Sequence, residues 1–129
     1  MAKRPYEISL WTHNDRFLST LLTSEASIDG EGFEPHFYDG ITGEKKLSFT
    51  IPIKYLNRDT NELVNNEKWY DELRKTHVLA NEKKVKLIFD KYKRDYNNKY
   101  IHEIHEFIIE DIQEERNGLE LFCRVECVG

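Results

Sequence analysis

The stretch that decides the fold is Ile101-His-Glu-Ile-His-Glu-Phe-Ile-Ile-Glu-Asp-Ile-Gln-Glu-Glu-Arg-Asn-Gly-Leu-Glu-Leu-Phe-Cys-Arg-Val-Glu-Cys-Val128. Two apolar segments in it are joined by Asn117-Gly118, a pair that accepts positive φ and is typical of the two-residue type I′ turn of a β-hairpin. We therefore predict a hairpin with strands over 106–116 and 119–128.

This turn also predicts a register for the hairpin. A two-residue loop at Asn117-Gly118 places Arg116 opposite Leu119. The same register pairs Ile112 with Cys123, Glu110 with Val125, Ile108 with Cys127 and, on the other face, Asp111 with Arg124. The Asp–Arg pair is a favourable cross-strand contact. The alternative is one helix over 101–115, since isoleucines at 101, 104, 108 and 112 have helical spacing. The β-branched side chains and the Asn-Gly pair favour strands.

Four further segments have strand character. Residues 6–12 alternate, with Tyr6, Ile8 and Leu10 on one face and Glu7, Ser9 and Trp11 on the other. Residues 17–22 and 85–90 are apolar runs of strand length, and 47–53 alternates cleanly. Pro52 predicts that this last strand lies at an edge or ends there.

The remaining segments are predicted as turns, loops and one helix. Residues 24–43 carry many glycines, and 57–66 is polar and turn-rich. Residues 67–75 have acids early, bases late, and Trp69 and Leu73 four apart, which predicts a two-turn helix that docks through Trp69. Residues 91–98 form a charged, tyrosine-rich loop.

Length and composition limit the class of protein. The chain has 129 residues, of which 39% are hydrophobic, 33% charged and 12% aromatic. This length suits one domain with its own core, and disordered chains are poor in aromatic residues. We predict a single domain over 1–129 of the mainly β class: an antiparallel β-barrel or sandwich with one short helix.

The charge of the chain excludes some partners. The formal net charge is −5, whereas nucleic-acid binders carry a basic footprint, so we expect no nucleic-acid partner. Basic residues gather locally over 83–86 and 91–94, where a solvated surface is favoured over a phosphate-binding patch.

No stretch approaches the ~20 apolar residues of a membrane span, and 1–6 lacks the apolar part of a signal peptide. We expect no membrane contact and synthesis in a cytoplasm.

A histidine pair resembles a metal motif at first sight. In His102-Glu-Ile-His105-Glu106 the histidines are three residues apart, whereas the zinc-protease motif needs them four apart on a helix. On a strand the two side chains point to opposite faces. We therefore predict no metal site here, and only the helical alternative would bring the two rings together.

The two cysteines are predicted to be structural. In a strand, Cys123 and Cys127 lie about 13 Å apart at ~3.3 Å per residue, beyond the ~7 Å that a disulfide spans. They are then free thiols that point the same way and pack in the core.

No other catalytic or ligand-binding motif is complete in the sequence. Gly30 and Gly32 lack the rest of a phosphate loop, and Asp29, Glu31 and Glu34 lack the twelve-residue calcium loop. No serine or cysteine has the context of a nucleophile elbow. We predict no catalytic, cofactor-binding or metal-binding residue and no enzymatic activity. The two tryptophans and seven tyrosines suit either a sugar- or peptide-binding surface or sheet packing, and packing is favoured.

Six short segments follow one another in a familiar order. They are Arg4-Pro-Tyr-Glu-Ile-Ser-Leu-Trp-Thr12, Leu47-Ser-Phe-Thr-Ile-Pro52, Asn66-Glu-Lys-Trp-Tyr70, Val85-Lys-Leu-Ile-Phe89, Glu106-Phe-Ile-Ile109 and Leu121-Phe-Cys-Arg-Val-Glu-Cys127. This order, over nearly the whole chain, resembles the N-terminal region of phage tail-tip hub proteins of the prophage tail endopeptidase or tail-associated type. The segment 91–100 is longer and more basic than that pattern.

The resemblance implies a structural virion component. It implies a β-barrel-like hub domain that trimerises at the end of a tail tube, with other tail proteins such as the tube or distal-tail ring as partners. Endopeptidase activity belongs to downstream domains of that family, so the chain is expected to be an N-terminal fragment, made in the host bacterial cytoplasm and located in the virion tail. The alternatives are a distal-tail ring or host-binding tail domain and, more distantly, a small metal-dependent hydrolase.

Overall fold

The computed structural model describes residues 4–25 and 34–129. Within them the chain forms eight strands and one helix. In chain order these are β1 (Tyr6–Trp11), β2 (Phe17–Thr23), β3 (His36–Asp39), β4 (Lys45–Asn57), β5 (Glu62–Asn65), α1 (Glu67–Lys75), β6 (Lys84–Phe89), β7 (Glu103–Asn117) and β8 (Glu120–Val128). In this part of the chain the only helix has nine residues, too short to cross a bilayer.

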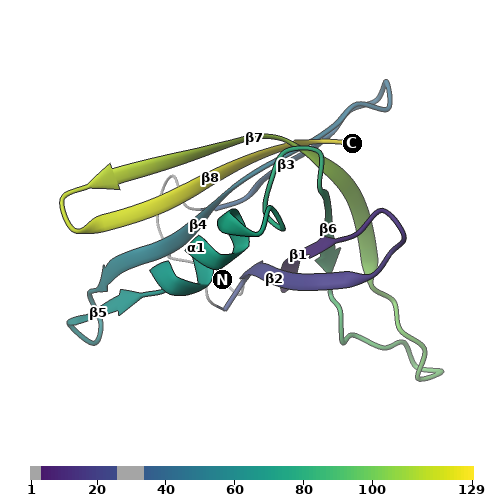
Figure 1. The fold of residues 1–129 in the computed structure, drawn as a ribbon. Helices are drawn as coiled ribbons and strands as arrows, with labels where there is room; N and C mark the ends of the chain where they lie inside the picture. Colours follow the sequence, from purple (N-terminus) through teal and green to yellow (C-terminus); the bar gives the residue numbers. More distant parts are fainter. Residues whose placement is uncertain (1–3, 26–33) are drawn as a thin grey trace.

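All strands belong to one antiparallel sheet in the order β2-β1-β6-β7-β8-β4-β3, with β5 paired to β4. The sheet bends at β7, which pairs β6 through residues 103–108 and β8 through residues 108–117 (Figure 1). The mainly antiparallel β class with one short helix is therefore confirmed. Among the described strands, β2 and β3 at the two ends do not pair, so the sheet stays open and does not close as a barrel.

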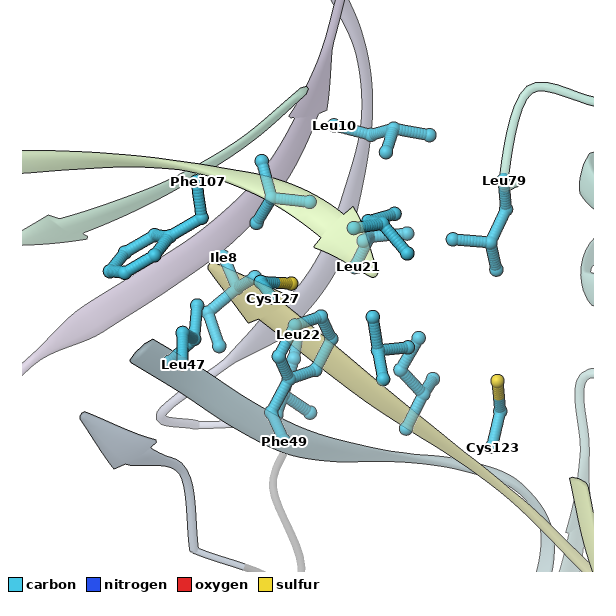
Figure 2. Close-up of a cluster of buried hydrophobic side chains, with 14 of the residues drawn as sticks. Ile8, Leu10, Leu21, Leu22, Leu47, Phe49, Leu79, Phe107, Cys123 and Cys127 are labelled. Carbon is cyan, nitrogen blue, oxygen red and sulfur yellow. The ribbon is translucent and has the colours of Figure 1, made fainter. Parts of the chain in front are cut away.

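The core lies on the concave face of this bent sheet. Alternate residues of four strands point into it, as period-2 patterning requires. These buried residues are Ile8, Leu10, Leu47, Phe49, Ile51, Ile53, Val85, Leu87, Leu121, Cys123, Val125 and Cys127. Figure 2 shows part of this cluster, with the sulfur atoms of both cysteines inside it. The cysteines are free, so the predicted core packing of both thiols is confirmed.

The strand that contains Pro52 is longer than the sequence predicted. β4 continues through Pro52 to Asn57, and a register shift against β8 falls between Pro52 and Lys54. On its other side β4 pairs β3 through residues 45–48 and β5 through residues 54–57. Pro52 lies between these short partners and at a bulge, where its missing N–H is tolerated. The strand β5 was not predicted in the turn-rich segment.

The helix begins and ends where the sequence predicted. The side chain of Asn65 accepts a hydrogen bond from the N–H of Glu67, and basic residues occupy the last turn. The main anchor is Tyr70, which is 1% exposed, whereas Trp69 and Leu73 are partly buried against the core. The expected docking through Trp69 is thus secondary to that of Tyr70.

The β7–β8 hairpin is confirmed, and the helical alternative is wrong. The turn lies one residue further on than predicted, because Asn117 pairs with Glu120 and leaves Gly118-Leu119 as the loop. Gly118 has φ 64, and Asn117 and Leu119 are not in the positive-φ region. Positive φ at the first central position is the pattern of a type II′ turn, not type I′.

The predicted register of the hairpin is wrong for two reasons. The displaced turn pairs Glu114 with Cys123 and Gln113 with Arg124. A bulge between Ile109 and Asp111 then shifts the pairing again, so that Ile109, not Ile108, lies opposite Cys127. One extra residue in a strand moves every later side chain to the other face. The expected Asp111–Arg124 pair does not form, and Asp111 lies opposite Glu126.

Candidate functional site

The outer, convex face of the sheet carries a groove that we call the aromatic groove. It has a volume of about 440 Å³ and is lined mainly by Trp11, Phe17, Tyr92, Tyr100, His102 and Ile104. Ile88 of β6 and the stems of two lysines, Lys86 and Lys91, complete the lining. Four separate parts of the chain build it: β1, β2, β6 with the segment that follows it, and the beginning of β7.

Trp11 is fixed at one side of the groove. Its indole Nε1 donates a 2.7 Å hydrogen bond to Oγ of Ser9, and its ring meets that of Phe17 edge to face at 5.5 Å. The ammonium of Lys86 lies 4.1 Å from the centre of the Trp11 ring. Such a cation–π contact holds the ring in place and covers part of its surface.

The charges beside Trp11 form a cluster that balances itself. Lys84 and Lys86 each contact two carboxylates, at 2.5 and 3.2 Å from Asp15 and at 3.4 and 3.5 Å from Glu106. The hydrogen bond with Lys84 holds the pKa of Asp15 below its usual value, and the same bond raises the pKa of Lys84. Both groups therefore stay charged at neutral pH.

The other wall is the segment 90–102, whose turn is closed by its own hydrogen bonds. The guanidinium of Arg94 donates to the hydroxyl of Tyr100 and to Asn98, and it lies 4.1 Å from the centre of the Tyr100 ring. The carboxylate of Asp95 accepts from the N–H groups of Asn97 and Lys99. These contacts hold Tyr100 against the groove.

A salt bridge ties the same segment to the sheet. Lys91 Nζ lies 2.9 Å from Oε2 of Glu7 on β1 and 5.6 Å from the centre of the Tyr92 ring. The hydrogen bond with Glu7 raises the pKa of Lys91. The tyrosines of the segment remain open to solvent, with Tyr92 79% and Tyr96 97% exposed.

The structure separates the two histidines of the metal-like motif. His102 lines the aromatic groove, whereas the ring of His105 lies 4.6 Å from the ring of Phe37 on β3, tilted by 44° to it. Nε2 of His105 lies 2.6 Å from a carboxylate oxygen of Glu103, and the hydrogen bond from His105 lowers the pKa of Glu103. In residues 4–25 and 34–129 no three His, Cys, Asp or Glu side chains group as metal ligands. Asp29, Glu31, Gly30 and Gly32 lie outside the described residues.

The cysteines are poor nucleophiles. Burial raises the pKa of Cys123 to about 11 and that of Cys127 to about 12. A thiol reacts as its thiolate, so neither side chain suits catalysis near neutral pH.

Sheet packing is the role predicted from sequence for the tryptophans and tyrosines, and the structure divides them. Trp69 and Tyr70 pack against the core, whereas Trp11, Tyr92 and Tyr100 line the groove. The signal for Trp11 was present in the sequence, because alternation placed it on the face opposite Ile8 and Leu10.

Comparisons of the chain with models of protein families, with curated proteins and with solved structures found no match.

Proposed function

We propose that this chain is a non-catalytic assembly domain that binds protein partners through the aromatic groove. The observation that carries the proposal is the exposed apolar surface of that groove, where Phe17 is 50%, Tyr100 52% and Ile104 45% exposed. Exposed aromatic and aliphatic groups that lie together mark interaction sites, and Trp and Tyr dominate the energetic centres of protein interfaces.

The ionisable groups of the groove favour binding over catalysis. A lysine that acts as a nucleophile or base needs a lowered pKa, so that its amine is neutral near pH 7. Lys91, which lines the groove, and Lys84, in the charge cluster beside Trp11, have raised pKa values, because each donates to a carboxylate. They act as fixed charges that can steer a partner.

The ring surfaces favour a protein over a sugar as the partner. Cations already lie over Trp11, Tyr92 and Tyr100. A sugar stacked on these rings would compete with the cations for the same surface. A protein side chain can enter from the open side of the groove and leave the cation–π contacts in place.

The resemblance to tail-tip hub proteins suggests which assembly this domain would belong to. We propose a structural component of a phage virion, the hub domain at the tip or baseplate of the tail, which associates with copies of itself and with other tail proteins. A distal-tail ring or host-binding tail domain is the alternative within the same setting. The proposal includes no enzyme activity, cofactor or nucleic-acid partner.

The state of association in solution tests this proposal. We expect reversible self-association that grows with protein concentration, weakens as salt screens the charges, and has three-fold symmetry when it closes. Sedimentation velocity over a series of protein and salt concentrations measures the equilibrium, and native mass spectrometry counts the copies. A chain that stays monomeric up to submillimolar concentration, or forms a tight two-fold dimer, contradicts the hub.

A further inference from the structure

We propose that the tip of the β7–β8 hairpin of one copy docks into the aromatic groove of the next copy. The hairpin tip is defined as residues 115–120. This inference rests on the proposed self-assembly and names the two surfaces that meet. The contact is heterologous, because each copy offers a tip at one place and a groove at another.

The hairpin tip carries an apolar side chain without a buried position in its own chain. Leu119 is 73% exposed in the two-residue turn. Turn residues are commonly polar or glycine, so the conformation of the turn does not explain an exposed leucine at this position. The aromatic groove offers the matching surface, with Phe17, Tyr92 and Ile104 around an open apolar hollow.

The charges on the two surfaces are complementary. Residues 108–128, which form the hairpin, hold six carboxylates and two arginines, a net charge of −4. Residues 83–100, which supply one wall and part of the floor of the groove, hold seven basic and two acidic residues. Three of these lysines are paired with Asp15, Glu106 and Glu7, and with those carboxylates counted the net charge of this surface is +2. Opposite fields of this kind orient two copies before contact and set which surfaces meet.

The hairpin tip of a copy does not reach its own groove. Ile104 at the groove and Asn117 at the tip lie on one strand, thirteen residues or about 40 Å apart along it at ~3.3 Å per residue. Figure 1 shows the turn between β7 and β8 on the left and the segment 90–102 at the lower right, with the body of the sheet between them. Contact between tip and groove therefore requires two molecules.

The contact joins apolar burial at its centre to charge pairs at its rim. Leu119 fills the hollow between Phe17 and Tyr92, and Glu115 and Glu120 face the basic side of the groove. Lys91 is available there, with 42% of its side chain exposed although it contacts Glu7. An apolar centre within a polar rim is the usual build of a protein interface.

Two single variants and their mixture test the contact. Leu119→Asp removes the apolar tip, and Tyr92→Ala removes a wall of the groove. We expect each to weaken self-association about tenfold or more, as loss of an interface anchor does. Ile41→Asp and Tyr38→Ala are matched controls, because Ile41 in the β3–β4 turn is fully exposed and Tyr38 on β3 is 56% exposed, at the end of the sheet opposite β2. Circular dichroism and thermal unfolding check that each variant is folded, and Leu119→Ser replaces Leu119→Asp if the latter is not.

The mixture distinguishes a head-to-tail contact from other interfaces. The Leu119→Asp chain keeps its groove and the Tyr92→Ala chain keeps its tip, so an equimolar mixture forms a 1:1 dimer that grows no further. Wild-type association that neither variant weakens overturns this inference and leaves the proposed function standing. A mixture that stays monomeric, when each variant alone is monomeric, also overturns it. Absence of wild-type association instead contradicts the proposed function itself.

Discussion

The hydroxyl of Tyr70 donates a 2.6 Å hydrogen bond to Oε1 of Glu114, and this contact fastens α1 to the β7–β8 hairpin. Burial, with the bond to Glu114 next, raises the pKa of Tyr70, so the phenol remains a donor throughout the neutral range. Glu114 lies on the outer half of β7, so the bond adds a contact with the helix to a hairpin that β8 already anchors by its pairing with β4.

Removing this hydroxyl should destabilise the chain. We expect Tyr70→Phe to lower the free energy of unfolding by about 1–2 kcal/mol, since bonds to charged groups contribute about 1.5–3 kcal/mol and exposed Glu114 regains water. Urea denaturation followed by tryptophan fluorescence measures the change. Tyr38→Phe, at an exposed tyrosine, is the control and should change stability by less than about 0.5 kcal/mol. Equal values for the two variants would show that the bond has no net effect.

Substitutions at two neighbouring residues of the hairpin turn should have different effects on stability. Gly118 has φ 64, so Gly118→Ala should cost about 1–2 kcal/mol through strain in the left-handed region. Asn117 is a strand residue, and Asn117→Ala should cost less than about 0.5 kcal/mol. Thermal or urea unfolding of both variants distinguishes the type II′ turn from the type I′ turn predicted from sequence. In the type I′ turn Asn117 and Gly118 would both have positive φ, so both substitutions would lower stability.

The bulge in β7 predicts that two neighbouring isoleucines contribute differently to stability. Ile109 is 1% exposed in the core, so Ile109→Ala should cost about 2–5 kcal/mol through lost burial and the cavity left behind. Ile108 is half-buried on the other face, and Ile108→Ala should cost about 1 kcal/mol. Urea denaturation of the pair measures the difference. A larger loss at Ile108 would place the strand in the register without the bulge.

The thiols should be unreactive in the folded chain. With pKa values of about 11 for Cys123 and about 12 for Cys127, both are protonated near neutral pH as well as buried. We expect slow reaction with a chromogenic disulfide reagent at about pH 8, and two rapid equivalents once urea unfolds the chain. A fast equivalent in the native protein would contradict the burial of one of them.

The cluster at Asp15 predicts a dependence of stability on pH. The folded pKa of Asp15 lies below its ordinary value of 3.8, chiefly because Lys84 donates to the carboxylate. The stabilisation is therefore present above the ordinary pKa and is lost as the pH falls through the lowered folded pKa. We expect Asp15→Asn to lower the urea midpoint at neutral pH and to match the wild type in strong acid. Asp59→Asn, in the turn between β4 and β5, is the control, and a constant difference from neutral to acid pH would argue against a charge effect.

Much of the fold followed from local patterns in the sequence. Alternation of apolar and polar residues predicted β1 and the first part of β4, and apolar runs predicted β2 and β6. The charge gradient with Trp69 and Leu73 predicted the helix at its observed bounds. Gly118 beside Asn117 predicted the hairpin, although its turn lies one residue further along the chain. These features depend on side chains near one another in the chain, so the sequence carries them directly.

Other features depended on contacts between distant segments. Residue spacing gives no sign of the bulge at Glu110, because Ile108 and Ile109 are both apolar and either could lie opposite Cys127 of the neighbouring strand. The extension of β4 past Pro52 depended on its pairing with β8 on one side and two short strands on the other.

The sequence by itself determined that this chain is mainly antiparallel β, with one short helix, a C-terminal hairpin and two cysteines in the core. Only the tertiary structure decided that the sheet remains open among the described strands, which isoleucine of β7 is buried, and where the aromatic groove lies. Trp11 and Tyr100 are 89 residues apart in the chain and share that groove only because β1 and β7 flank β6 in the sheet. Periodicity fixes which face of a strand is apolar, but the order of strands is set by the burial that all of them achieve together.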